Sequence, residues 1–143
     1  MIRISKLADY AVVVLSVMAE NAGVLMSAAH ASEITKLPEP TVSKVLKLLA
    51  KGDILESKRG TTGGYLLVRS PKDLTIRDII RAVDGPVLIT SCADGEVPDC
   101  SLSECCTLRG KWDGVNEAVR NALDGVTLAD MMDTNVTTKE SAA

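Results

Sequence analysis

The spacing of apolar residues along the chain predicts a mainly helical fold. One apolar stripe recurs at helical intervals over residues 6–20, directly after Ser5, whose hydroxyl can cap the first turn. A shorter helix is expected over residues 28–35, with Ser27 as its cap. The apolar positions that define the first helix are Leu7, Ala11, Val14, Leu15 and Met18.

A third helix is expected to begin near Pro40, whose fixed φ suits a first turn, and to end at Gly52, a candidate left-handed cap. Only the turn at residues 36–39 separates it from the second helix. Such a pair is either a helix-turn-helix or an ordinary helical hairpin with a solvated lysine face, and this segment alone leaves both open. The expected inner face has Val42, Val45, Leu46 and Leu49, and the outer face has Thr41, Ser43, Lys44, Lys47 and Lys51.

The next segment favours the DNA-binding interpretation. Residues 54–59 and 65–69 have the pattern of two strands joined by a glycine-rich loop. A helix-turn-helix followed by a basic hairpin is a winged helix, whose recognition helix reaches the major groove and whose wing reaches phosphates or the minor groove. The candidate wing residues are Lys58, Arg59, Gly63 and Gly64, the glycines because they would let the backbone approach DNA closely.

Beyond the hairpin, Thr75 and Asp78 resemble a capping box for a fourth helix. After a cysteine-rich loop, apolar residues recur in alternating steps of four and three, a heptad-like seam. This seam predicts a long fifth helix that packs on a partner subunit; a helix docked within one subunit is the alternative. A short helix is expected from Thr127. The seam residues are Leu108, Trp112, Val115, Val119 and Ala122.

The elements give an expected division of the chain into four parts. These are a winged helix-turn-helix DNA-binding domain at 1–85, a cysteine-rich cluster-binding loop at 86–107, a dimerisation helix with a short C-terminal helix at 108–133, and a disordered tail at 134–143.

Charge is distributed unevenly over the 143 residues, although the net charge is only −3. Residues 1–70 have nine Lys or Arg against six Asp or Glu, whereas residues 71–143 have seven against thirteen. A basic first half indicates a polyanion partner for that half. With a single histidine, no phosphate loop and no paired nucleophile and base, the chain is not expected to be an enzyme or to take a small-molecule substrate.

No apolar run reaches the roughly 18–20 residues that a membrane span needs. The N-terminal stretch imitates a signal peptide, but Asp9 interrupts its apolar run and the apolar spacing is helical. We therefore expect a cytoplasmic protein without a membrane partner.

All four cysteines lie between Cys92 and Cys106 in a polar loop. In a reducing compartment, clustered cysteines are more often metal ligands or redox-active groups than structural disulfides. Thiolates bind both iron and zinc, so the ligand type does not choose between them. Zinc sites usually contain a pair of cysteines separated by two to four residues, and only Cys100 and Cys105 have a comparable spacing. The cysteine spacing of plant-type ferredoxins does not fit either, because its third cysteine has no counterpart here.

The chain resembles the iron–sulphur-sensing winged-helix regulators of the IscR and NsrR type, the Rrf-two family. The resemblance covers residues 1 to about 132 and rests on MIRISKLADYAVVVL, PTVSKVLKLLAKGDILESKRGTTGGYLL and IRDIIRAVDGP. The segment WDGVNEAVRNALDGVTLADM is most similar to the branch that controls SUF-type cluster assembly.

The resemblance implies a homodimer that binds a palindromic double-stranded DNA operator and holds a [2Fe–2S] or [4Fe–4S] cluster. Thr41, Ser43 and Lys44 would read the major groove, with Arg59 at the minor groove. Ser43 stands where relatives have an acidic residue that reads cytosine, so the relatives' operator does not carry over.

The family's three-cysteine loop fits Cys92, Cys100 and Cys106 as cluster ligands, with Cys105 as the alternative to Cys106 because adjacent thiols rarely ligate one metal. IscR-type members take a fourth ligand from a histidine at the position of Arg109, whose guanidinium has no lone pair to offer.

NsrR-type members instead use an aspartate from the first helix of the partner subunit, and Asp9 lies at the matching place. Its alternative role is that of a first-turn carboxylate favoured by the helix dipole.

Two rival functions remain. One keeps DNA binding but uses the cysteines as a thiol–disulfide or zinc switch. The other is a small cluster-transfer or electron-carrier protein, against which the winged helix argues.

Overall fold

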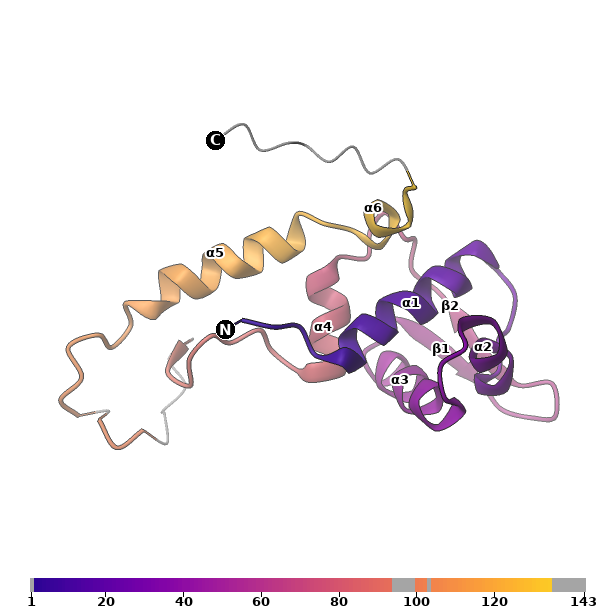
Figure 1. The fold of residues 1–143 in the computed structure, drawn as a ribbon, viewed down its shortest axis with the longest axis horizontal. Helices are drawn as coiled ribbons and strands as arrows, with labels where there is room; N and C mark the ends of the chain where they lie inside the picture. Colours follow the sequence, from indigo (N-terminus) through magenta and orange to yellow (C-terminus); the bar gives the residue numbers. More distant parts are fainter. Residues whose placement is uncertain (1, 94–99, 103, 135–143) are drawn as a thin grey trace.

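The computed structural model describes residues 2–93, 100–102 and 104–134. Over these residues the protein is mainly helical with one antiparallel two-stranded hairpin, as the apolar pattern predicts. Figure 1 shows a compact body made of the first four helices and the hairpin, from which α5 extends as an arm. The elements are α1 Lys6–Glu20, α2 Ala28–Thr35, α3 Glu39–Lys51, β1 Leu55–Lys58, β2 Gly64–Leu67, α4 Ile76–Asp84, α5 Trp112–Asp124 and α6 Leu128–Met132.

The core of the body forms where α1, α3 and α4 bury their apolar stripes against one another. Each stripe is aliphatic, in line with a chain that has no Phe. The hairpin joins this core through Met26, which exchanges two backbone hydrogen bonds of 2.9 Å with Tyr65 and so ties the start of α2 to β2. Buried residues that the sequence pattern predicts as inward-facing are Ala11, Val14, Leu15, Met18, Val42, Val45, Leu46 and Leu49. Ile76 and Ile79 of α4 are buried with them.

Side-chain caps begin α1, α2 and α4 at the predicted residues. The hydroxyl of Ser5 accepts from the Ala8 N–H and also donates to the Asp84 carboxylate at 2.6 Å, which joins the start of α1 to the end of α4. Ser27 caps α2, and Thr75 forms a full capping box with Asp78 at the start of α4. Because such caps pair orphan backbone donors, they fix where each helix begins.

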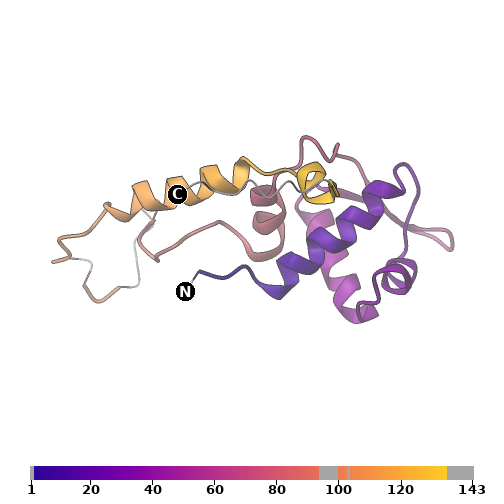
Figure 2. The same cartoon turned by 45° about the horizontal axis from the view of Figure 1, so that its top comes forward.

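The short helix α6 packs back onto the body rather than continuing the arm. Leu128 is fully buried, and its N–H donates to the Leu74 carbonyl at 2.8 Å. Thr127 and Asp130 form a second capping box, in which hydrogen bonds from Thr127 hold the pKa of the Asp130 carboxyl below its usual value. Figure 2 shows this return of the chain from the end of α5 to the body beside α1.

Two predictions about helix ends were wrong. Gly52 is not left-handed, since its φ is −85°, and the left-handed residue is Asp53 with a φ of 59°. The fifth helix begins at Trp112, so Leu108 lies in the loop before it, and Gly110, with a φ of 75°, separates the two. The spacing of apolar residues predicts that the seam starts at Leu108. The left-handed turn at Gly110, a conformation that glycine adopts readily, instead separates Leu108 from the helix.

Gly52 is needed because α3 and α4 approach closely there. A Cβ at Gly52 would lie 2.7 Å from the Cβ of Ala82, inside contact distance. The Gly52→Ala variant is therefore expected to lower the free energy of unfolding by about 1–3 kcal/mol, the usual cost of overpacking. Urea denaturation followed by circular dichroism measures it.

Gly114→Ala provides the matched control. Gly114 lies within α5 with open space where its Cβ would be, so alanine there should raise the free energy of unfolding by about 0.5–1 kcal/mol. Equal effects of the two substitutions would contradict the close approach of α3 and α4.

The predicted tail at 134–143 lies outside the described residues, apart from Thr134. Within the described ranges, no helix combines the length and the apolar character that crossing a membrane requires.

Candidate DNA-binding surface and cysteine loop

The turn between α2 and α3 is held by side chains as well as by the backbone. The hydroxyl of Ser32 donates to the Leu37 carbonyl at 2.6 Å, and the Thr35 hydroxyl donates to the Ala31 carbonyl at 2.7 Å. The same Thr35 oxygen accepts from the Leu37 N–H at 3.3 Å, and Lys36 takes a left-handed φ of 61°. These bonds set the angle at which α3 leaves α2, as a helix-turn-helix requires.

The predicted recognition residues lie together on α3, on the side away from the core. The inward face of the helix is fully buried, whereas Lys44 and Lys47 are exposed. Thr41 and Ser43 are half-buried. The structure therefore provides one exposed helical face with two ammonium groups and two short hydroxyls, the donors and acceptors that can meet phosphates and base edges.

The wing follows α3 directly. Lys58 pairs with Gly64 at the end of the hairpin register, and both Lys58 and Arg59 are exposed at the tip. A Cβ on Gly63 would overlap the Lys58 carbonyl, and one on Gly64 would lie 2.8 Å from the Met26 carbonyl. The fold of the hairpin therefore requires glycine at both positions. This requirement is independent of the close approach to DNA for which the sequence analysis selects the two glycines.

The four cysteines are all free thiols. Cys92 is half-buried in a turn closed by the Ala93 N–H and the Thr90 carbonyl at 3.2 Å, with the Thr90 hydroxyl 3.4 Å from its sulphur. The other three thiols are exposed. Within the described part of the chain, no three His, Cys, Asp or Glu side chains converge as a metal site would. The donor set suits an iron–sulphur cluster in its chemistry, since thiolates are the cluster's preferred ligands, but the described donors are not gathered around one point.

The segment that leads to Cys92 lies against α5. The side-chain oxygen of Asn116 accepts from the Ile89 N–H at 3.0 Å, and Nε of Arg120 donates to the Val87 carbonyl at 3.2 Å. Sequence reasoning missed Asn116. The available signal was a polar residue one helical turn beyond Trp112, beside the apolar seam.

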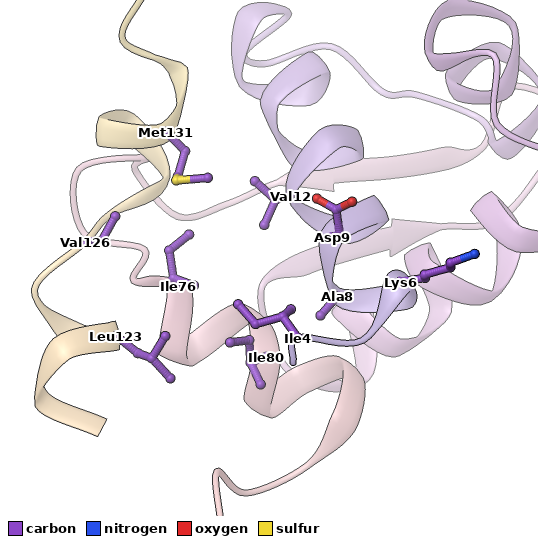
Figure 3. Close-up of a pocket in the computed structure, with 10 residues that line it drawn as sticks. All are labelled: Ile4, Lys6, Ala8, Asp9, Val12, Ile76, Ile80, Leu123, Val126 and Met131. Atoms are coloured by element: carbon purple, nitrogen blue, oxygen red, sulfur yellow. The ribbon is translucent and has the colours of Figure 1, made fainter. Parts of the chain in front are cut away.

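Asp9 is exposed in the first turn of α1, beside an apolar groove of about 370 Å³ between α1, α4 and the α5–α6 connection. Figure 3 shows the carboxylate beside Val12, at the edge of a group of aliphatic side chains that includes Ile80 and Leu123. Figures 1 and 2 agree that the described chain leading into α5 lies at the end of that helix away from α6 and α1. Among the described residues of one subunit, Asp9 belongs to no group of three metal-binding side chains.

Several known transcriptional regulators are similar to this chain in sequence and in fold. The chain is 27% identical over 131 residues to the regulator NsrR of Bacillus licheniformis, covering 91% of this chain and 92% of that one. Among solved structures, CymR, the global cysteine regulator of B. subtilis, superposes with a TM-score of 0.66 at 26% identity, over 92% of this chain and 97% of that one. IscR of T. potens gives a TM-score of 0.63 at 30% identity, over 92% and 86%.

These similarities extend through the helix-turn-helix, the wing and α5, and confirm the winged-helix fold. The family model Rrf2, described as an iron-dependent transcriptional regulator, matches residues 4–134, which is nearly the whole chain. The chain therefore belongs to the Rrf2 family of transcriptional regulators.

Proposed function

We propose that the protein is a homodimeric transcriptional regulator whose operator binding is controlled by an iron–sulphur cluster, and that its targets include SUF-type cluster-assembly genes. The observation that carries this proposal is the group of four free thiols on one loop of an Rrf2-family winged helix. The SUF assignment rests on the sequence of α5 and α6 alone.

The operator-binding elements are the outer face of α3 and the tip of the wing. Thr41, Ser43, Lys44 and Lys47 would meet the major groove, while Lys58 and Arg59 would reach phosphates or the minor groove. The exposure of these lysines and of Arg59 supports the assignment.

The dimer would form along α5, because one subunit leaves an apolar row there uncovered. Trp112 and Val115 are 38% and 45% exposed, and Ala122 is exposed on the same helix. Val119 differs from the exposed residues of the predicted seam, since it is half-buried and lines a groove together with residues of the subunit's own N-terminal segment. An uncovered apolar row on an extended helix is typical of a subunit interface.

The cluster ligands would be Cys92, Cys100 and Cys106, with Cys105 as the alternative to Cys106 and Asp9 supplied by the partner subunit. Asp9 belongs to no group of three metal-binding side chains in the described part of one subunit, which supports a ligand supplied across the dimer. A bound cluster would supply a redox- and iron-sensitive link between the loop and the DNA-binding body. The protein would place a hard carboxylate ligand beside soft thiolate ligands. Because a carboxylate binds the iron of a cluster less firmly than a thiolate does, the cluster would be lost more readily, as a sensor requires.

Anaerobic purification tests the proposal. We expect iron and sulphide in comparable amounts, charge-transfer absorbance in the visible range, and an affinity for a DNA fragment selected from random sequence that differs between the loaded and the metal-free protein. Mössbauer spectroscopy would assign the cluster type. A protein free of iron and sulphide, or DNA binding that ignores the cluster, would contradict cluster control.

A second candidate keeps DNA binding but uses the cysteines as a thiol–disulfide or zinc switch. Three of the four thiols are exposed, and Cys105 and Cys106 are adjacent, so oxidants could reach them. Equimolar zinc, or a reversible disulfide found by mass spectrometry in an iron-free protein, would support this candidate instead.

A further inference from the structure

A hollow of about 280 Å³ lies where α4, α5 and the segment after α4 meet. Three arginines from two helices line it, Arg77 and Arg81 of α4 and Arg120 of α5. Pro86 and Val87 complete the lining, and no acidic side chain of the described residues belongs to it. Three guanidinium groups therefore border one small space without a carboxylate among its described lining residues.

This gathering of arginines contrasts with the charge of the surrounding chain. Residues 71–143 have seven Lys or Arg against thirteen Asp or Glu, yet three of the seven line this hollow. Arg77 and Arg81 also lie four residues apart on α4, a spacing at which two like charges destabilise a helix. An anion in the hollow would offset this repulsion.

The three arginines differ in the contacts that they make within the chain. Arg77 donates to the Asp124 carboxylate at 2.6 Å, and Nε of Arg120 donates to the Val87 carbonyl at 3.2 Å. These contacts hold two of the guanidinium groups at the hollow. Arg81 is exposed and makes no side-chain hydrogen bond or ion pair within the described part of the chain. Its donors are therefore available to a ligand.

An adjoining hollow is a poorer site for an anion. Arg81 borders it as well, together with Arg69 and Lys51. Its lining also includes the carboxylates of Asp53 and Asp78. Asp78 accepts from Arg69 at 2.9 Å, so opposite charges pair there within the chain. The larger excess of positive charge lies on the side of Arg81 that faces α5.

We propose that the hollow between α4 and α5 is a binding site for a compact phosphate-bearing anion of the class of inorganic phosphate. A phosphoryl group offers three acceptor oxygens, whereas a carboxylate offers two in one plane. Guanidinium groups pair with either, and three of them from two helices match the larger number of acceptors. The bound anion joins α4 of the body to α5 of the arm and stabilises that junction. The proposal does not depend on the cysteines.

Calorimetric titration and thermal unfolding with sodium phosphate test the site, with sodium chloride at matched ionic strength as the reference. Wild type should show saturable binding and a rise in Tm that chloride does not produce. Arg81→Ala should bind phosphate about 10–100-fold more weakly, since it loses hydrogen bonds between charged groups. Because Arg81 is exposed, the substitution should leave the fold intact.

Lys72→Ala is the matched control for net charge. Lys72 is an exposed residue of the loop before α4, in the same acidic half of the chain, and does not line the hollow. Its substitution removes the same charge as Arg81→Ala, so we expect phosphate binding at the wild-type affinity. Equal weakening in the two variants would overturn the proposal, because it would report net charge rather than a site.

The Nε–H signals of arginines in ¹⁵N NMR spectra locate the bound anion. Phosphate should shift the signals of Arg77, Arg81 and Arg120 together and leave that of Arg69 in the adjoining hollow unchanged. Shifts confined to Arg69 would place the anion elsewhere and overturn the proposal.

Three further outcomes would contradict the site or its ligand. Wild-type protein that responds to phosphate no more than to chloride would remove the site. Malonate that binds as tightly as phosphate would overturn the ligand class, because malonate has two carboxylates and no phosphoryl group. If Arg81→Ala weakened DNA binding while wild type bound no inorganic phosphate, Arg81 would contact the nucleic-acid backbone and the hollow would have no ligand of its own.

Discussion

Cys92→Ala and Cys106→Ala are each expected to leave a purified protein with less than about a tenth of the wild-type iron, because each removes one of the three proposed thiolate ligands. Cys105→Ala should retain its iron, since adjacent thiols rarely serve one metal. Iron and sulphide assays after anaerobic purification measure the effect. The opposite result for the two neighbouring cysteines would assign Cys105 as the ligand, and loss of iron in neither variant would contradict a loop-held cluster.

These substitutions should not disturb the fold. Cys105 and Cys106 are exposed, and Cys92 lies in a surface turn outside the core. The metal-free variants should therefore unfold within about 0.5 kcal/mol of metal-free wild type. A much larger loss of stability would mean that the iron result reports misfolding rather than a missing ligand.

Mixed dimers decide whether Asp9 acts across the interface. One subunit carries Asp9→Ala with intact cysteines, and the other carries Cys92→Ala with intact Asp9. If the carboxylate comes from the partner subunit, one complete site forms in each mixed dimer, because two-fold symmetry pairs the intact loop with the intact Asp9. If Asp9 is only a first-turn helix carboxylate, the mixed dimer should hold iron no more firmly than an Asp9→Ala homodimer.

Local signals determined most of the fold. Ser5, Ser27 and Thr75 each cap a helix at the residue where short-range hydrogen bonding favours it, and the stripe of α3 marks the buried face correctly. These features depend on neighbours within a few residues along the chain, which a sequence displays directly.

Features that depend on contacts between distant segments were not predictable in the same way. Gly52 lacks a side chain because Ala82 of another helix lies against it, and nothing near Gly52 in sequence reveals this. Asn116 likewise has its role through Ile89, twenty-seven positions earlier in the chain. Spacing identifies Cys92, Cys100 and Cys106 as candidate ligands, but the described positions do not gather them, so the site's final geometry depends on what binds there.

Lys44→Ala combined with Lys47→Ala is expected to weaken operator binding by on the order of 10²–10³-fold near 0.1 M salt, because a dimer would lose several phosphate contacts at once. Both ammonium groups are exposed on the outer face of α3, away from the buried stripe, so the fold should be unaffected. The slope of the logarithm of the DNA-binding constant against the logarithm of the salt concentration should also become less steep, by about 1 for each lysine that contacts a phosphate. Fluorescence anisotropy with a selected operator fragment, titrated over a range of salt concentrations, measures both quantities.

Lys72→Ala separates this effect from a general change in charge. Lys72 is also exposed but lies in the loop before α4, where it lines a hollow together with Ala129 and Met132 of α6. Figure 1 shows α6 and α3 on opposite sides of the body. The loss of Lys72 removes the same charge as a single Lys44→Ala, so net charge alone would give the two variants equal salt slopes. We expect a flatter slope for Lys44→Ala and a slope near wild type for Lys72→Ala. Equal slopes would mean that the polyanion meets a different face of the protein, and α3 would then lose its assignment as the recognition helix.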